Sequence, residues 1–169
     1  MTDGPGRRSA PFSPTVRGAV RDDVAELVRL DDAARAHLRS QRGGVLHLVR
    51  SARPDPPDAS LDADIAAADT HVAMGCLGDV PVGYAVTRLV HLEDGRRIAE
   101  VTDIFVETAA RDVGVGNALM HDAVRWAVEH GCVGIDAHAM PGDRATKNFF
   151  ESFGLVARAI TVHRDLSGP

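Results

Sequence analysis

Apolar residues in the first half of the chain recur at helical spacing. They follow the aspartate pair at residues 22–23, which suits a helix N-terminus, at Val24, Leu27, Val28 and Leu30. The pattern predicts an amphipathic helix and leaves open whether it continues or restarts through residues 33–38. A short strand is predicted before it at residues 16–20. Three prolines in residues 51–60 (SARPDPPDAS) indicate a surface loop, and residues 61–68 fit one short helix.

The second half carries alternating, strand-like runs and a strongly amphipathic helix. Gly78, Asp79 and Pro81 separate the first two runs, which predicts an antiparallel hairpin. This half predicts an α/β fold with a mixed sheet, in which an antiparallel meander precedes a helix–strand–helix–strand series. The last strand of that series is expected to close the sheet. In chain order the predicted elements are strands 70–77, 82–90 and 98–106, helix 114–130, strand 133–139, helix 144–153 and strand 156–163.

Length and composition predict a single globular domain. The chain has 169 residues, and we assign residues 15–166 to the domain and residues 1–14 to a disordered lead-in. A net charge of −5 and an aromatic content of 4% argue against a nucleic-acid partner. No apolar run reaches the roughly 18 residues of a membrane span, so no membrane partner is expected. The N-terminus does not resemble a signal peptide, and we expect a cytoplasmic protein.

Cysteine and histidine give no sign of a metal site. Cys76 and Cys132 form neither a disulfide framework nor a ligand cluster. The eight histidines are scattered and make no HExxH motif, so we expect no metal. His138 is the one histidine that the predicted strands place beside the segment described next.

One segment carries the candidate chemistry. A strand predicted to end at Val106 is followed, after a spacer, by Gly114 and Gly116 at the start of the long helix. Glycine allows close backbone approach, and a helix N-terminus offers free N–H groups and a positive dipole end, which suits phosphate. A packing device between helix and sheet fits two glycines equally well. A dinucleotide-binding turn fits poorly, because Leu119 stands at the third glycine position. A P-loop is excluded because no Gly-Lys-Ser/Thr follows.

The spacer adds a further observation. The sequence Arg-x-x-Gly-x-Gly at residues 111–116, after a strand, resembles the acyl-coenzyme-A-binding motif of the GNAT superfamily of N-acetyltransferases. Residues 82–85 (VGYA) resemble that family's third strand, and residues 143–155 resemble its late helix. The resemblance spans residues 15–166. It implies a GNAT-like fold with splayed central strands and flanking helices, and by analogy it is compatible with a homodimer.

The resemblance also implies an activity. It implies an acetyl-CoA-dependent N-acetyltransferase whose acceptor, a small-molecule or peptide amine, attacks the donor directly in a ternary complex. Backbone amides at the helix start would hold the pyrophosphate of coenzyme A, and a backbone N–H near Val106 would polarise the thioester carbonyl. The residues implied in acetyl-CoA binding are Phe105, Val106, Arg111, Val113, Gly114, Val115, Gly116, Asn117, Ala118 and Asn148.

Glu100 and Asp103 are the two candidates for the general base that deprotonates the amine. Strict alternation along their strand places them on opposite faces, so that at most one of them would face the acceptor. Phe150 stands where many members of the family carry a tyrosine acid, and Tyr84 is expected in the core. Two alternatives therefore stay open: a non-catalytic coenzyme-A-binding sensor or scaffold, and an acyltransferase with a larger acyl-CoA. The acceptor is expected over residues 20–70 and the hairpin.

Overall fold

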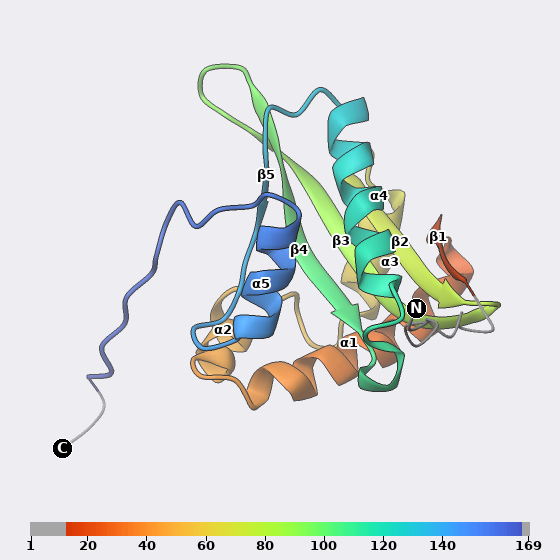
Figure 1. Ribbon diagram of the computed structural model, residues 1–169, viewed down its shortest axis with the longest axis horizontal. Helices are drawn as coiled ribbons and strands as arrows, with labels where there is room; N and C mark the ends of the chain where they lie inside the picture. Colours follow the sequence, from red (N-terminus) through yellow and green to blue (C-terminus); the bar gives the residue numbers. More distant parts are fainter. Residues whose placement is uncertain (1–12, 167–169) are drawn as a thin grey trace, which may run out of the picture.

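A computed structural model describes residues 13–166, so the predicted lead-in lies almost wholly outside the described residues. Figure 1 shows the elements in chain order: β1 (Pro14–Gly18), η1 (Arg21–Asp23), α1 (Val24–Arg39), α2 (Gly44–Arg50), α3 (Asp58–Ala66), β2 (Thr70–Leu77), β3 (Val80–His91), β4 (Arg97–Val106), η2 (Thr108–Ala110), α4 (Val115–Glu129), β5 (Ile135–Ala137) and α5 (Arg144–Ser152). Within the described residues, no helix has both the length and the apolar character that a membrane span requires.

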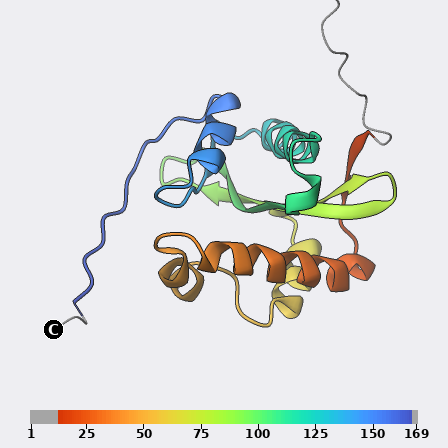
Figure 2. The same ribbon diagram turned by 60° about the horizontal axis from the view of Figure 1, so that its bottom comes forward.

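The sheet separates two layers of helices, as Figure 2 shows. Helices α1, α2 and α3 cover one side, which we call the α1 face, and helices α4 and α5 cover the other side, the α4 face. The long helices α1 and α4 each turn an apolar stripe toward the sheet. On the α1 face the fully buried side chains include Leu27, Leu30, Leu61, Tyr84 and Val86. On the α4 face the buried side chains include Val101, Val115, Leu119, Met120 and Phe150.

The strands run in the order β1-β2-β3-β4-β5, and neighbouring strands are antiparallel except for β4 and β5. The parallel pair β4–β5 is short: it starts at Ala99 with Ile135 and ends at Val101 with Ala137. Strand β4 continues from there to Val106 with no partner on that side among the described residues. The two strands therefore splay apart, which confirms the predicted fold class.

The structure corrects three predicted elements. Helix α2 was not predicted, and α3 begins at Asp58, inside the predicted loop. The predicted strand at residues 156–163 is absent: that segment is extended but pairs with no strand among the described residues. Alternation describes side chains, whereas a strand also needs a neighbouring edge that accepts its hydrogen bonds. In a single copy of the chain, residues 156–163 do not follow such an edge.

Candidate active site

The loop between β4 and α4 curls so that its backbone N–H groups converge. Asp112 (φ 64°) and Gly114 (φ 96°) both adopt the left-handed conformation. Left-handed residues among ordinary ones turn successive N–H groups toward one side and form a nest for an anion. The Ala118 N–H donates to the Gly114 carbonyl oxygen at 2.9 Å. The N–H groups of residues 115–117 come before that bond and have no intrahelical acceptor. The loop therefore offers several amides to one ligand.

Gly116 lies where α4 approaches both α5 and the end of β4. A Cβ atom there would lie 3.5 Å from the Phe149 ring and 3.8 Å from a methyl group of Val106. Any longer side chain would meet these neighbours and fill the space between them. The two distances from a Cβ atom are ordinary van der Waals contacts, so packing does not require glycine at residue 116. Gly114, in contrast, has a backbone conformation that other residues adopt only with strain.

Strand β4 presents free backbone groups beside the splay. The Glu107 N–H donates to β3 at 2.9 Å, so alternation in the antiparallel pair directs the backbone groups of Phe105 to β3 and those of Val106 away from it. Beyond Val101 that outer side is the splay. The Val106 carbonyl oxygen accepts a 3.2 Å hydrogen bond from Arg111 Nε. The Val106 N–H therefore faces the gap, while the backbone groups of Phe105 are committed to β3.

Glu100 and Asp103 lie on the same face of the sheet, contrary to the prediction. Glu100 is opposite Arg88 and Asp103 is opposite Val86, two positions of β3 that share the α1 face. A bulge explains this, because Thr102 is an extra residue that has no partner on β3. Strict alternation from residue 100 to residue 103 therefore fails, and both carboxylates face α1, α2 and α3.

Asp103 is held by an ion pair. Arg53, from the proline-rich loop between α2 and α3, places Nη2 at 2.7 Å from Asp103 Oδ2, and the Thr102 hydroxyl donates to the same oxygen at 2.8 Å. The Arg53 side chain is only 4% exposed and also binds Asp64 at 2.9 Å. Burial alone would lower the pKa of Arg53, but the Asp103 and Asp64 carboxylates outweigh it and raise the pKa above its usual value. Asp103 thus neutralises a buried cation.

Tyr84 belongs to the same buried network. Its hydroxyl donates to Asp31 Oδ1 at 2.9 Å, and the side chain is fully buried. Burial raises the pKa of Tyr84 well above its usual value, and the charges of Asp103 and Asp31 add to the effect. Arg35 completes the network, because it binds Asp31 and donates to the backbone oxygen of Arg53 at 2.8 Å. Tyr84 is a core residue, as predicted, and is not placed to protonate a substrate.

Glu100 is the less encumbered carboxylate. Its side chain is 33% exposed, and its Oε1 lies 3.5 Å from Nδ1 of His138, which follows β5 across the splay. His47 of α2 stands close to the same region. Burial lowers the pKa of His47, and the charge of His138 lowers it further, against the opposing effect of Asp103. A carboxylate beside an imidazole can accept a proton and pass it to solvent.

The predicted positions on α5 divide between its two sides. Phe150 is 6% exposed and packs with Val101, Met120 and Ala123 in the core. Asn148 is exposed on the same helix, and its part in acetyl-CoA binding stays a prediction. Asp143 caps the helix by accepting a 3.0 Å hydrogen bond from the Thr146 N–H.

The side chains of the β4–α4 loop either pack into the core or are exposed to solvent. Val113 and Val115 pack into the core of the α4 face. Arg111 and Asn117 are exposed, and Ala118 offers only a methyl group. At these implied positions the exposed side chains of Arg111 and Asn117 can add to a ligand contact, and the backbone N–H groups supply the remaining donors.

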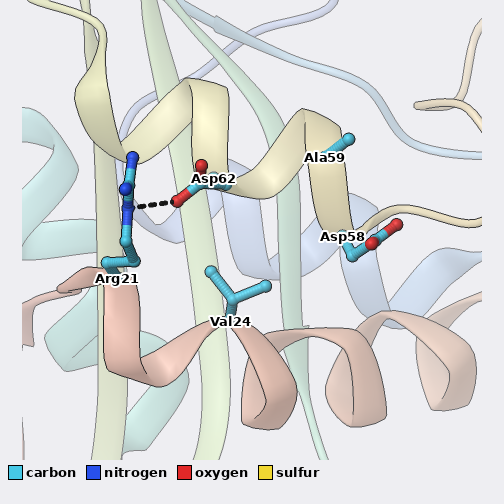
Figure 3. A pocket seen from close by; sticks show the side chains of 5 residues that line it. All are labelled: Arg21, Val24, Asp58, Ala59 and Asp62. Carbon is cyan, nitrogen blue, oxygen red and sulfur yellow. Dashed lines mark ion pairs between the residues drawn. The ribbon is translucent and has the colours of Figure 1, made fainter.

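Other features of the surface lie apart from this site. A hollow of about 300 Å³ lies between η1, the start of α1, and α3. Figure 3 shows the side chains that line it, and Arg21 and Asp62 form an ion pair of 2.8 Å among them. None of its lining residues belongs to the motif or to the carboxylate pair. Among residues 13–166, no group of three or more His, Cys, Asp or Glu side chains is arranged to hold a metal ion.

Sequence reasoning missed Arg53 and His47 entirely. Arg53 lies in a loop expected on the surface, and His47 lies in a helix that was not predicted. The one signal for Arg53 in the sequence was the presence of aspartates, such as Asp31 and Asp64, at positions where the helical pattern predicts buried residues. Buried carboxylates need a cation as partner.

The comparisons with known proteins agree with this geometry. A family model described as the acetyltransferase (GNAT) family matches residues 34–155. A sequence search of curated proteins gave no significant match. Among solved structures, a tetramutant of the BH1408 protein from Bacillus halodurans superposes with a TM-score of 0.75 at 19% identity, covering 90% of this chain and 99% of that chain.

Two aminoglycoside acetyltransferases are also similar. AAC(6')-Iy, solved with a bisubstrate analogue of coenzyme A and acetylneamine, has a TM-score of 0.68 at 14% identity, covering 90% of this chain and 97% of its own. The enzyme meta-AAC0020 from an uncultured soil sample, solved with sisomicin, has a TM-score of 0.65 at 17% identity, covering 92% and 97%. At these identities the structures show the fold, while the family model matches well over half of the sequence. The chain therefore belongs to the acetyltransferase (GNAT) family.

Proposed function

We propose that the protein is an acetyl-CoA-dependent N-acetyltransferase in which an amine attacks the donor directly. The observation that carries the proposal is the splay. The motif loop lies at the start of α4, on the α4 face, whereas Glu100 and Asp103 lie on the α1 face. The two sides meet only where β4 and β5 part, at the free edge that carries the Val106 N–H.

The residues of the motif loop and of the free edge of β4 suit acetyl-CoA as the acetyl donor. The nest formed by Asp112 and Gly114, with the unpaired amides of residues 115–117, suits a pyrophosphate, and coenzyme A carries one. A pantetheine arm entering the splay would run along the free edge of β4. There the Val106 N–H can donate to the thioester carbonyl oxygen and stabilise the charge that develops on it.

On the α1 face, Glu100 is the base. An amine at pH 7 is an ammonium, so it must lose a proton before it can attack. Glu100 can accept that proton directly or through water, and His138 at 3.5 Å gives it a route to solvent. Asp103 supports the site in another way, because its ion pair with Arg53 fixes the proline-rich loop against β4. The aminoglycoside enzymes of the same fold suggest a polyamine-like small molecule as acceptor.

The leaving thiolate has no tyrosine to protonate it. Phe150 has no hydroxyl, and the Tyr84 hydroxyl is buried and donates a hydrogen bond to Asp31. A thiolate can leave as the anion, and this is the course we propose. The same observation favours a second candidate function, a coenzyme-A-binding module without turnover. An acyl group larger than acetyl is a third, since no contact in the structure fixes the depth of the acyl site.

Calorimetry and a thiol-release assay together test these functions. Titration with acetyl-CoA should give micromolar binding, with NAD as the negative control. Gly116→Asp should abolish binding, because the added carboxylate meets Phe149 and repels the pyrophosphate. Amine-dependent thiol release from a panel of aminoglycosides and polyamines would establish turnover. Binding without release from any acyl-CoA and amine would favour the sensor, and absence of binding would reject the whole assignment.

A further inference from the structure

The stretch from residue 33 to residue 54 differs in charge from the rest of the chain. The whole chain has a net charge of −5, yet this stretch contains five arginines and no aspartate or glutamate. Two of the arginines are buried in the network described above. Arg39, Arg42 and Arg50 are exposed, and none of these three has an ion pair or a side-chain hydrogen bond with another described residue. One end of an acidic protein is therefore basic at its surface.

Helix α2 adds apolar side chains to this basic region. Val45, Leu46 and Val49 are 63%, 43% and 83% exposed. Helical spacing places the three on one side of α2, with Arg50 at the border of that side and the buried Gly44 opposite. Apolar side chains that gather at the surface and are exposed to this degree mark a surface that a partner covers.

The position of α2 on the domain is fixed by close packing. A Cβ atom at Gly44 would lie 1.8 Å from the carbonyl oxygen of Leu38, so α2 sits directly against the end of α1. Figure 2 shows α2 at one end of the helical layer on the α1 face. The exposed side of α2 therefore presents its apolar residues in one set arrangement.

The same apolar residues line a hollow of about 490 Å³. Gln41 and Gly43, from the turn before α2, also line it, and residues 163 and 165 border it from the C-terminal segment. Arg42 lies between two of the lining residues in the chain, and Arg50 directly follows a third. A hollow of this kind suits one bulky apolar side chain with carboxylates beside it, because arginine binds carboxylates with two parallel hydrogen bonds. A membrane surface is broad and flat and would not enter the hollow.

We propose that Arg39, Arg42, Val45, Leu46, Val49 and Arg50 form a docking surface, the α2 patch, for an acidic polypeptide segment that carries a bulky apolar residue. The apolar residue would fill the hollow, and the acidic residues around it would pair with the three arginines. Charge complementarity identifies this class of partner, because the arginines have no acidic partner among the described residues of their own chain. The patch is small, so we expect a weak and transient complex.

The first experiment selects the partner sequence without assuming it. A library of random peptides displayed on phage is selected on the immobilised full chain, and enriched peptides are synthesised and measured by fluorescence anisotropy. We expect the enriched peptides to contain more Asp and Glu than Lys and Arg, and to share at least one large apolar residue. Enrichment of neutral or basic peptides, or no enrichment, would overturn the proposal.

Variants of the chain then locate the binding surface of the enriched peptides. Val49→Asp and Arg42→Glu should each weaken peptide binding at least about tenfold, because the first puts a charge in the hollow and the second repels a carboxylate. Val128→Asp, on the exposed side of α4, and Arg96→Glu, at the β3–β4 turn, are the matched controls and should bind like the native chain. All four positions are exposed, so circular dichroism should show an unchanged fold. Native affinity in Val49→Asp, or an equal loss in Val128→Asp, would place the peptides elsewhere and contradict the assignment.

Two further measurements separate this surface from a membrane site and from the acetyl-CoA site. Co-sedimentation with vesicles of phosphatidylcholine and phosphatidylserine should show no binding that Val49→Asp removes, and such binding would mean that the patch contacts lipid instead. Calorimetry with acetyl-CoA should give the same affinity for Val49→Asp and the native chain, because the motif loop lies on the α4 face. Peptide binding does not require acetyl transfer, so failure here is distinguishable from failure of the proposed function.

Discussion

The loop that would bind acetyl-CoA offers mainly backbone groups, whereas the α1 face beside the splay offers side chains. The loop uses backbone: two left-handed residues and a helix start turn N–H groups toward one ligand, and its side chains point to the core or to solvent. The α1 face uses side chains: Arg53 joins Asp31, Asp64 and Asp103 from three different elements. A backbone site depends on local conformation. A site of ion pairs depends on the placing of distant segments.

This difference predicts how each half tolerates substitution. The loop should accept changes of side chain except where a Cβ atom disturbs the backbone. On the α1 face a single substitution should lower the stability strongly, because the removal of one buried charge leaves its partner charges uncompensated. Four measurements test this, from the largest expected effect to the smallest.

Glu100→Gln should lower kcat by about 10²–10⁴-fold, because it removes the base while keeping the shape of the side chain. The affinity for acetyl-CoA should stay unchanged, since Glu100 lies on the other face of the sheet from the loop. Steady-state kinetics with an active amine and calorimetry measure the two quantities. Glu93→Gln, at an exposed turn position, is the matched control. A kcat within threefold of the native value would remove Glu100 from the mechanism.

Arg53→Met should cost about 3–5 kcal/mol of unfolding free energy, because it removes a buried cation that Asp31, Asp64 and Asp103 share. Asp31 and Asp64 keep their ion pairs with Arg35 and Arg88, whereas Asp103 loses its cation. Urea denaturation measures the loss. Arg50→Met, three residues earlier and exposed, should change stability by less than about 0.5 kcal/mol. If the two variants proved equally stable, the α1 face would not depend on this network.

Tyr84→Phe should cost about 1.5–3 kcal/mol, because Asp31 loses a buried hydrogen bond to a charged group. It should also change the alkaline limit of stability. The pKa of Tyr84 is raised in the folded protein, so the unfolded chain releases this proton first, near pH 10, and stability falls as pH rises beyond that value. Thermal unfolding between pH 8 and pH 11 should show a shallower fall for the variant. Identical slopes would contradict this account.

Gly114→Ala should cost about 1–2 kcal/mol, because alanine resists a φ of 96°. It should also weaken acetyl-CoA binding by displacing the amides beside it. Gly95→Ala is the matched control, since Gly95 has a φ of 82°, open space around it and no place in the loop. Both variants should lose similar stability, but only Gly114→Ala should lose affinity. Equal affinities would show that the turn at Gly114 serves packing alone.

Local signals accounted for most of the fold and for the loop in which we propose that the donor binds. The stripe of α4 and the glycines of the loop express conformational preferences of neighbouring residues, so they can be read without the rest of the chain. The same reasoning failed at Thr102, where one bulged residue moved Asp103 to the face of Glu100. It also failed at residues 156–163, whose strand pattern has no edge to follow within one copy.

The sequence by itself determined the series of elements from the hairpin to α5, the family and the position of the motif loop, because each depends on residues close together in the chain. Only the tertiary structure decided which charges meet. Arg53 and Asp103 are far apart in sequence and 2.7 Å apart in space. Glu100 lies on β4, and His138, 3.5 Å from it, follows the end of β5. Burial without water forces such charges to pair, but it does not fix their partners until the helices have packed on the sheet.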